Sequence, residues 1–213
     1  MIELNPYIIL SKPQLGENIG STARAMKNFG IKNLLIVQPR DGWPNNSAFA
    51  PAAGADDVLN QAKLFDSISE ATKTISLLFA TTARKRVVGT KSLSIFKAIE
   101  KSFEHVVNGG NVGFLFGPEQ SGLSNDDVVQ ADYTVSIPIN KEFSSLNISQ
   151  AVLLMCWEWN KIKMSFLNED KNFVKINKKL KKSTELSNIG DSCLLYTSPS
   201  PRDRTRSRMP SSA

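Results

Sequence analysis

Histidine and cysteine are scarce in this sequence, with one histidine and two cysteines among 213 residues. The single histidine, His105, excludes a metal site built from several histidines, although a Ser-His-Asp triad needs only one. Cys156 and Cys193 cannot form a disulfide framework, which favours a reducing cytoplasm. We therefore expect a cytoplasmic protein whose functional site contains no metal.

Long apolar segments are absent as well. No apolar run approaches the roughly 18 residues that a membrane span requires. The first four residues bring neither a basic start nor an apolar signal core, so we expect no secretion signal. The G-x-G-x-x-G fingerprint of dinucleotide sites is also missing, and an ordinary Rossmann cofactor site therefore has no support.

The net charge of +6 is unevenly distributed. Residues 1–167 carry 16 Lys and Arg against 15 Asp and Glu, whereas residues 168–213 carry 10 against 5. Because the first part is nearly neutral, any contact that it makes with nucleic acid must come from a local basic patch.

Composition divides the chain into three parts. Residues 1–167 form the predicted domain, and residues 168–192 are a basic linker or the start of a C-terminal extension, with a weakly amphipathic stretch over 171–182. Residues 183–213 have almost no apolar content and cannot bury enough surface to fold. Residues 193–213 resemble translated vector sequence, and we expect them to be a non-native, disordered tail.

Short apolar runs alternate with amphipathic stretches throughout residues 1–167, which is typical of an α/β fold with a parallel sheet and helices on both faces. Strands are predicted at residues 7–10, 34–37, 75–80, 112–116 and 133–139, and helices at residues 18–29, 55–63, 67–73, 92–107 and 147–166. Residues 40–54, rich in Pro, Asn and Ala, are predicted to be a long loop. In such a sheet, ligands bind where the loops that follow the strands meet.

Three of these loops carry recognisable motifs. In chain order they are NIGSTARAM at residues 18–26, FGPEQSGL at 116–123, and IP at 137–138 with SSLNIS at 144–149. Together they resemble the signature motifs of the SpoU branch of the SPOUT superfamily, RNA ribose 2′-O-methyltransferases that use S-adenosyl-L-methionine. One motif alone would be weak, but the ordered set is specific and the resemblance covers roughly residues 6–165.

The resemblance implies a catalytic set of Arg24, Asn18, Glu119, Ser145 and Asn147. From the residues alone, Arg24 is a helix-surface arginine, Glu119 is a turn carboxylate, and the Asn and Ser side chains are helix N-caps. In the family pattern, Arg24 is the catalytic arginine. A ribose hydroxyl is a poor nucleophile, and a fixed guanidinium can orient it and stabilise developing negative charge.

The resemblance also implies a pocket for S-adenosyl-L-methionine. The residues it assigns to this pocket are Thr81, Thr82, Ala83, Gly117, Ile137, Ser144, Ser145 and Leu146. The glycine would let the backbone approach the cofactor closely, and backbone groups with apolar contacts would hold the adenine. Taken alone, the basic run Arg84, Lys85 and Arg86 predicts a solvated turn. Because it follows a loop of the methyl-transfer site, we predict that this run binds RNA phosphates together with Arg24.

Two further features come from the resemblance alone. One is a C-terminal deep trefoil knot within residues 111–150. The other is a homodimer in which Arg24 of one protomer completes the active site of the other. Trp157 and Trp159 on the last helix are predicted to be core or dimer-interface residues.

The expected substrate is RNA. Within the family, residues 81–84 and 142–147 look most like those of the tRNA methyltransferases that act on the ribose of position 32 in the anticodon loop. Two alternatives stay open: the same chemistry on the tRNA wobble nucleotide or on rRNA, and a catalytically inactive RNA-binding module with the same fold.

Overall fold

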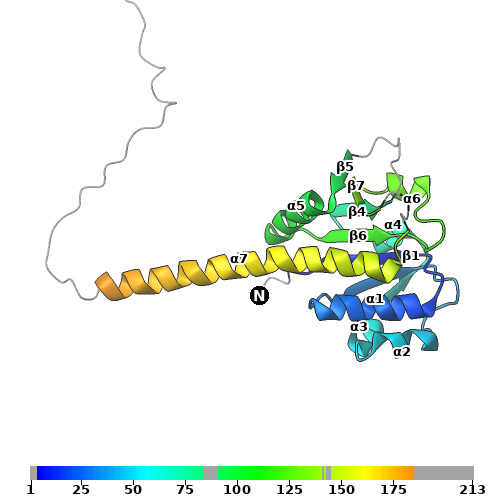
Figure 1. Ribbon diagram of the computed structural model, residues 1–213, viewed down its shortest axis with the longest axis horizontal. Helices are drawn as coiled ribbons and strands as arrows, with labels where there is room; N and C mark the ends of the chain where they lie inside the picture. The colour runs from blue at the N-terminus through cyan, green and yellow to red at the C-terminus, as the bar shows by residue number, and fades with distance from the viewer. Residues whose placement is uncertain (1–3, 84–90, 141, 143–144, 185–213) are drawn as a thin grey trace, which may run out of the picture. The chain divides into compact units, whose positions relative to one another are not determined.

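The computed structural model describes residues 4–83, 91–140, 142 and 145–184, and for residues 169–184 it describes the backbone alone. The chain divides into two compact units, Met1–Asp170 and Lys171–Ala213. The first unit contains a β-sheet and the helices that cover it (Figure 1). The described part of the second unit, up to Thr184, is helical.

Seven strands in the described part of the chain form one parallel sheet, in the order β3-β2-β1-β6-β4-β7-β5. Their bounds are β1 Tyr7–Ser11, β2 Asn33–Val37, β3 Lys63–Phe65, β4 Leu77–Thr81, β5 Lys91–Ser94, β6 Val112–Phe116 and β7 Tyr133–Ser136. The central strand β6 is buried at every position. A strand covered on both faces needs such a continuous apolar run, which is why the sequence revealed it.

Helices cover both faces of the sheet, so the predicted α/β fold with a parallel sheet is confirmed. The larger core lies under α1 (Gly16–Asn28), α2 (Phe49–Ala52), α3 (Asp56–Gln61), α5 (Ile95–Val107) and the start of α7 (Ile148–Thr184). The smaller core, on the opposite face, lies under α4 (Ile68–Ala71) and α6 (Asn125–Val129). None of the helices that the structure describes combines the length and apolar character needed to cross a lipid bilayer.

The five predicted strands are present, but the two edge strands were missed. β3 has three residues and β5 has four, and both are largely exposed, so neither shows an apolar pattern. The predicted helix over 92–107 is wrong at its start. Leu93 belongs to β5 and pairs with Val135 of β7, and the helix begins at Ile95 with Ser94 as its N-cap. Pairing with the neighbouring strand overrides the local signal there.

The predicted helices differ from the observed ones mainly at their ends. The predicted loop over 40–54 contains the 3₁₀ turn η1 (Asn46–Ala48) and α2, while the predicted helix over 55–63 ends at Gln61 and Lys63 opens β3. The last helix passes the predicted end at residue 166 and runs to Thr184. Its continuation is rich in lysine, which has a good helix propensity.

Candidate active site

A pocket of about 270 Å³ opens at the carboxyl edge of the sheet. The loops after β4, β6 and β7 and the first turns of α7 form its walls. The lining residues are Thr81, Thr82, Ala83, Phe116, Gly117, Pro118, Glu119, Gln120, Ser121, Gly122, Leu123, Val135, Ile137, Ile139, Ser145, Leu146, Ile148 and Ala151. Three loops that are far apart in the sequence therefore meet in one hollow, as the parallel sheet predicted.

The end of β4 is fastened to both of its neighbours in the sheet. The Thr81 hydroxyl donates a hydrogen bond to the carbonyl oxygen of Leu115 in β6, at 2.9 Å. The backbone N–H of Thr82 donates to the carbonyl of Val135 in β7, also at 2.9 Å. These bonds fix residues 81–83 between the two loops that form the rest of the pocket.

The loop after β6 folds back on itself. The N–H of Gly122 donates to the carbonyl oxygen of Pro118 at 2.8 Å, and Gly122 has a φ of +65°. A Cβ atom at Gly117 would collide with the backbone of Gly122 and Leu123. The structure thus gives its own reason for glycine at 117, namely the close return of the loop, beside the predicted approach of a cofactor.

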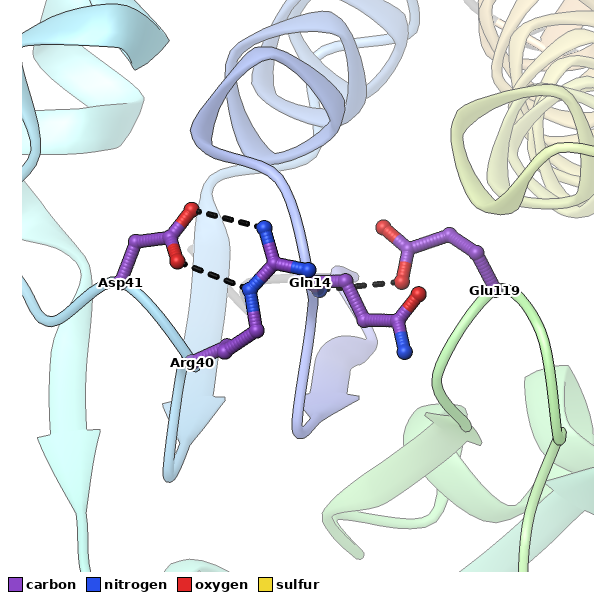
Figure 2. Close-up of polar contacts among 4 residues, drawn as sticks. All are labelled: Gln14, Arg40, Asp41 and Glu119. Atoms are coloured by element: carbon purple, nitrogen blue, oxygen red, sulfur yellow. Dashed lines mark hydrogen bonds and ion pairs between the residues drawn. The ribbon is translucent and has the colours of Figure 1, made fainter.

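One chain of hydrogen bonds joins the three motifs. Asn18 Nδ2 donates to Glu119 Oε1 at 2.7 Å, and Asn147 Nδ2 donates to Asn18 Oδ1 at 2.8 Å. The backbone N–H of Gln14 donates to the other oxygen, Glu119 Oε2, at 3.0 Å (Figure 2). Both carboxylate oxygens are therefore held, and Glu119 ties the loop after β6 to the loop and helix after β1.

The family model described as the SpoU rRNA Methylase family matches residues 5–157. The chain belongs to this family. Among curated proteins, the tRNA (cytidine/uridine/adenosine-2'-O-)-methyltransferase TrmJ of Pseudomonas aeruginosa (strain UCBPP-PA14) is 37% identical over 150 residues, which cover 70% of this chain and 57% of that protein. The tRNA (cytidine/uridine-2'-O-)-methyltransferase TrmJ of Sodalis glossinidius is 38% identical over 154 residues, covering 72% and 60%.

Solved structures of similar proteins agree with the family. The crystal structure of TrmJ from Z. mobilis ZM4 has a TM-score of 0.70 and 50% identity, and covers 73% of this chain and 68% of that one. A probable methylase family protein from Haemophilus influenzae Rd KW20 also has a TM-score of 0.70, with 33% identity over 80% of this chain and 70% of that one. The chain spans about three fifths of the length of the curated relatives it matches.

In this SpoU family member, the residues predicted to bind the cofactor lie together. Seven of the eight line the pocket, and the eighth, Ser144, lies outside the described residues, as do Arg84, Lys85 and Arg86. Arg24 lies elsewhere. Its side chain is exposed on α1 and is not part of the pocket wall.

The alternative of Asn18 as a helix N-cap is wrong. The helix begins at Gly16 behind Leu15, which makes no side-chain cap, and the carboxamide of Asn18 turns to Glu119 instead. Asn147 does cap its helix, since its Oδ1 accepts from the Ser149 N–H at 2.8 Å while its Nδ2 stays in the network. Ser145 lines the pocket. Sequence reasoning missed Gln14, because its contribution is a backbone N–H and no residue type signals that.

No group of three or more His, Cys, Asp or Glu side chains among the described residues could hold a metal ion. Burial raises the pKa of the Cys156 thiol to about 12, so this cysteine in α7 stays protonated. His105 lies outside the pocket and contacts the Ser76 hydroxyl at 2.8 Å.

Proposed function

We propose that the chain is an S-adenosyl-L-methionine-dependent RNA methyltransferase that methylates a ribose 2′-hydroxyl, with position 32 of the tRNA anticodon loop as its target. The observation that carries this proposal is the joining of all three SpoU motifs around one pocket by the Asn147–Asn18–Glu119 hydrogen bonds. The names of the relatives, tRNA 2'-O-methyltransferases, support the reaction and the class of substrate.

The pocket suits S-adenosyl-L-methionine. Apolar side chains of Ile137 and Leu146 line the pocket together with polar groups of the loops after β4 and β6, and small pockets use this combination to hold and orient a ligand. The carboxylate of Glu119 in the wall places negative charge near a cationic sulfonium. When bound, the cofactor supplies an electrophilic methyl group, and the chain's task is to present the ribose hydroxyl to it.

Arg24 is the proposed catalytic residue, and it would act in the pocket of a second protomer. Its exposed position on α1 leaves the guanidinium accessible to another chain. There it would hold the hydroxyl and the adjoining phosphate and stabilise negative charge on the ribose oxygen.

An exposed apolar face supports the homodimer. On α7, Leu153, Leu154 and Trp157 are between 38% and 48% exposed, and Leu15 before α1 is 44% exposed. The two helices run side by side (Figure 1), and the Trp157 ring packs edge-on against Phe29, with centroids 5.9 Å apart. Because clustered exposed apolar side chains mark interaction sites, we propose that a second copy covers this face.

The proposed knot lies within residues 111–150. The strand order is compatible with it: β6 lies between the earlier strands β1 and β4, and β7 pairs with β4 and β5. The proposal itself comes from the family to which the chain belongs.

The deciding experiment is a methyl-transfer assay with bulk tRNA and labelled S-adenosyl-L-methionine, followed by mapping of the methylated nucleotide. Arg24→Ala should lower the rate by about 100-fold or more, as expected for loss of a group that stabilises developing charge. Its affinity for the cofactor, measured by calorimetry, should stay unchanged, because Arg24 does not line the pocket of its own chain. An equal loss of methyl-transfer rate and cofactor affinity in Arg24→Ala would contradict the assigned role. A wild type that binds tRNA but not the cofactor would be an RNA-binding module instead.

A further inference from the structure

The loop after β2 brings an arginine to the same edge of the sheet as the pocket. β1 and β2 are paired along their whole length, from Tyr7 with Asn33 to Ser11 with Val37. Immediately after them, Lys12 and Gln38 have φ values of 49° and 45°, a left-handed conformation that costs side-chain-bearing residues about 1 kcal/mol or more. The segments after β1 and β2 therefore both turn sharply. The Arg40 N–H donates a hydrogen bond to the carbonyl oxygen of Pro13 at 3.0 Å.

This loop is linked to the pocket through two hydrogen bonds. Arg40 is tied to Pro13, and the next residue, Gln14, donates its backbone N–H to Glu119 in the pocket wall at 3.0 Å. Figure 2 shows the guanidinium of Arg40 between Asp41 and Gln14, with Glu119 beyond Gln14. Arg40 thus has a fixed place next to the second motif, although it belongs to none of the motifs.

Asp41 fixes the orientation of this guanidinium. Arg40 Nε donates to Asp41 Oδ1 at 2.8 Å and Nη2 donates to Oδ2 at 3.1 Å, which defines the plane of the group. The Arg40 side chain is 55% exposed, and an exposed ion pair of neighbouring residues adds little to stability. Its main physical effect is to hold the arginine in one orientation.

One end of the guanidinium makes no hydrogen bond within the described part of the chain, although the negative charge of Glu119 attracts Arg40 from beyond Gln14. The bonds to Asp41 use Nε and one N–H of Nη2, and within the described part of the chain Nη1 has no hydrogen-bond acceptor. The Nη1 and Nη2 N–H groups on this side form a fork that matches two oxygens of a phosphate. Lys12, exposed at the end of β1, adds positive charge to the same edge.

We propose that Arg40 binds a backbone phosphate of the RNA strand that reaches the pocket, with Asp41 as the residue that positions it. This inference rests on the proposed function, since it takes RNA to be the substrate. It extends the RNA contact to the β1–β2 side of the sheet, whereas Arg84, Lys85 and Arg86 follow β4 in the sequence.

The test measures tRNA binding by the full chain between 50 and 200 mM salt for Arg40→Ala, Arg40→Lys and Asp41→Asn. Loss of one phosphate contact should reduce the salt slope by roughly 0.7–0.9, so Arg40→Ala should lose about threefold less affinity over this range than the wild type. Lys27→Ala is the matched control, because it removes one positive charge from an ion pair of similar exposure, Lys27 with Asp57. It should leave the slope unchanged.

Arg40→Lys and Asp41→Asn separate a positioned contact from bulk charge. Arg40→Lys keeps the charge but loses the fork, and should bind tRNA more weakly than the wild type. Asp41→Asn makes the surface more positive, so bulk electrostatics predicts tighter binding, whereas a positioned Arg40 predicts weaker binding. Tighter binding by Asp41→Asn, or equal slopes for Arg40→Ala and Lys27→Ala, would overturn the inference.

Two further measurements separate this inference from the proposed function. S-adenosyl-L-methionine should bind Arg40→Ala and the wild type equally well, and a parallel loss of cofactor affinity would overturn the inference by showing that Arg40 acts through the pocket. If the wild type binds tRNA but transfers no methyl group, the proposed function fails and the binding comparison still decides about Arg40. A wild type that binds no tRNA overturns both.

Discussion

Glu119 has each carboxylate oxygen held by a donor from a segment about 100 residues away in the chain. A carboxylate that accepts hydrogen bonds on both oxygens is well satisfied, and removing a partner would leave charge without compensation. Its role in the structure is to join the loop after β6 to the loop and helix after β1. The pocket wall and the first motif consequently have one fixed relative position.

Gly117 tests the close return of the loop. Gly117→Ala should lower cofactor affinity at least tenfold and stability by about 1–3 kcal/mol, because the methyl group meets backbone atoms of Gly122 and Leu123 that cannot move aside cheaply. Calorimetry and urea denaturation measure the two effects. Ser121→Ala is the control for stability in the same loop, since Ser121 is exposed and its hydroxyl lies 3.4 Å from the Gly122 carbonyl oxygen. Its cofactor affinity is not compared, because Ser121 also lines the pocket. Equal losses of stability in Gly117→Ala and Ser121→Ala would contradict a clash between the added methyl group and the returning loop.

Cys156 gives a pH dependence with a defined sign. Its folded-state pKa is raised from 9.0 to about 12 by burial, so below pH 9 both folded and unfolded states keep the proton. Above pH 9 the unfolded state loses it and the native state does not, and stability falls as the pH rises. From pH 8 to pH 10, the wild type should lose about 1 kcal/mol more than Cys156→Ala. Urea denaturation in a Cys193→Ser background measures this, and parallel pH profiles would count against the burial effect.

The sequence predicted those parts of the site in which side chains of the motifs interact with one another. Asn18, Glu119 and Asn147 were singled out, and the structure joins them directly. The sequence could not reveal the partners that are backbone groups, such as the Gln14 N–H. It also could not separate structural from functional glycines: Gly20, inside the first motif, lets α1 pack against the carbonyl of Ala48.

The first half of α7 connects the pocket to the core. Ile148 and Ala151 line the pocket, and two turns later Trp159 is fully buried. Its ring packs edge-on against Phe103 and Phe114, and its Nε1 donates to the carbonyl oxygen of Leu4 at 3.2 Å. The position of the last helix therefore depends on the large core beneath it.

The two tryptophans of α7 should respond differently to the same substitution. Trp159→Phe should cost about 2 kcal/mol, because it removes buried ring atoms and the hydrogen bond from Nε1 to the Leu4 carbonyl oxygen. Trp157→Phe should change stability by about 0.5 kcal/mol or less, since Trp157 is 48% exposed. Urea denaturation followed by circular dichroism at low protein concentration gives both values. A larger loss for Trp157 would contradict this assignment of core and surface.

Strands and helices could be predicted where their burial requires a pattern of apolar residues in the sequence. The strands β1, β2, β4 and β6 carry apolar runs because both of their faces are covered, whereas β7 is indicated by its β-prone residues Tyr133, Thr134 and Val135. The edge strands β3 and β5 are short and exposed, and pairing with a neighbour rather than their own composition makes them strands. The short α6 was missed although Ser124 and Asp127 form a capping box, because five residues show no helical period.

At the scale of the whole molecule, the proposed dimer predicts complementation between two impaired variants, assayed at a cofactor concentration too low to fill the Gly117→Ala pocket. Arg24→Ala has an intact pocket, and Gly117→Ala has an intact arginine. When the two are coexpressed, about half of the dimers should be mixed and each mixed dimer should have one complete site, giving about one quarter of wild-type methyl transfer. Each variant expressed alone is the control. If the coexpressed pair is no more active than the variants alone, each site uses its own Arg24.

The place of β6 in the sheet has a consequence for biosynthesis. β6 pairs with one edge of β1, joining Tyr7 to Gly113, so this edge waits for a partner made more than a hundred residues later, while the other edge pairs with β2. Closing so long a loop is entropically costly, and folds with such distant pairings assemble slowly. Until then the growing chain exposes an apolar strand edge that can pair with other nascent chains. Truncated products that end before residue 112 should therefore aggregate, and early folding of this protein depends on how well the cell shields that edge.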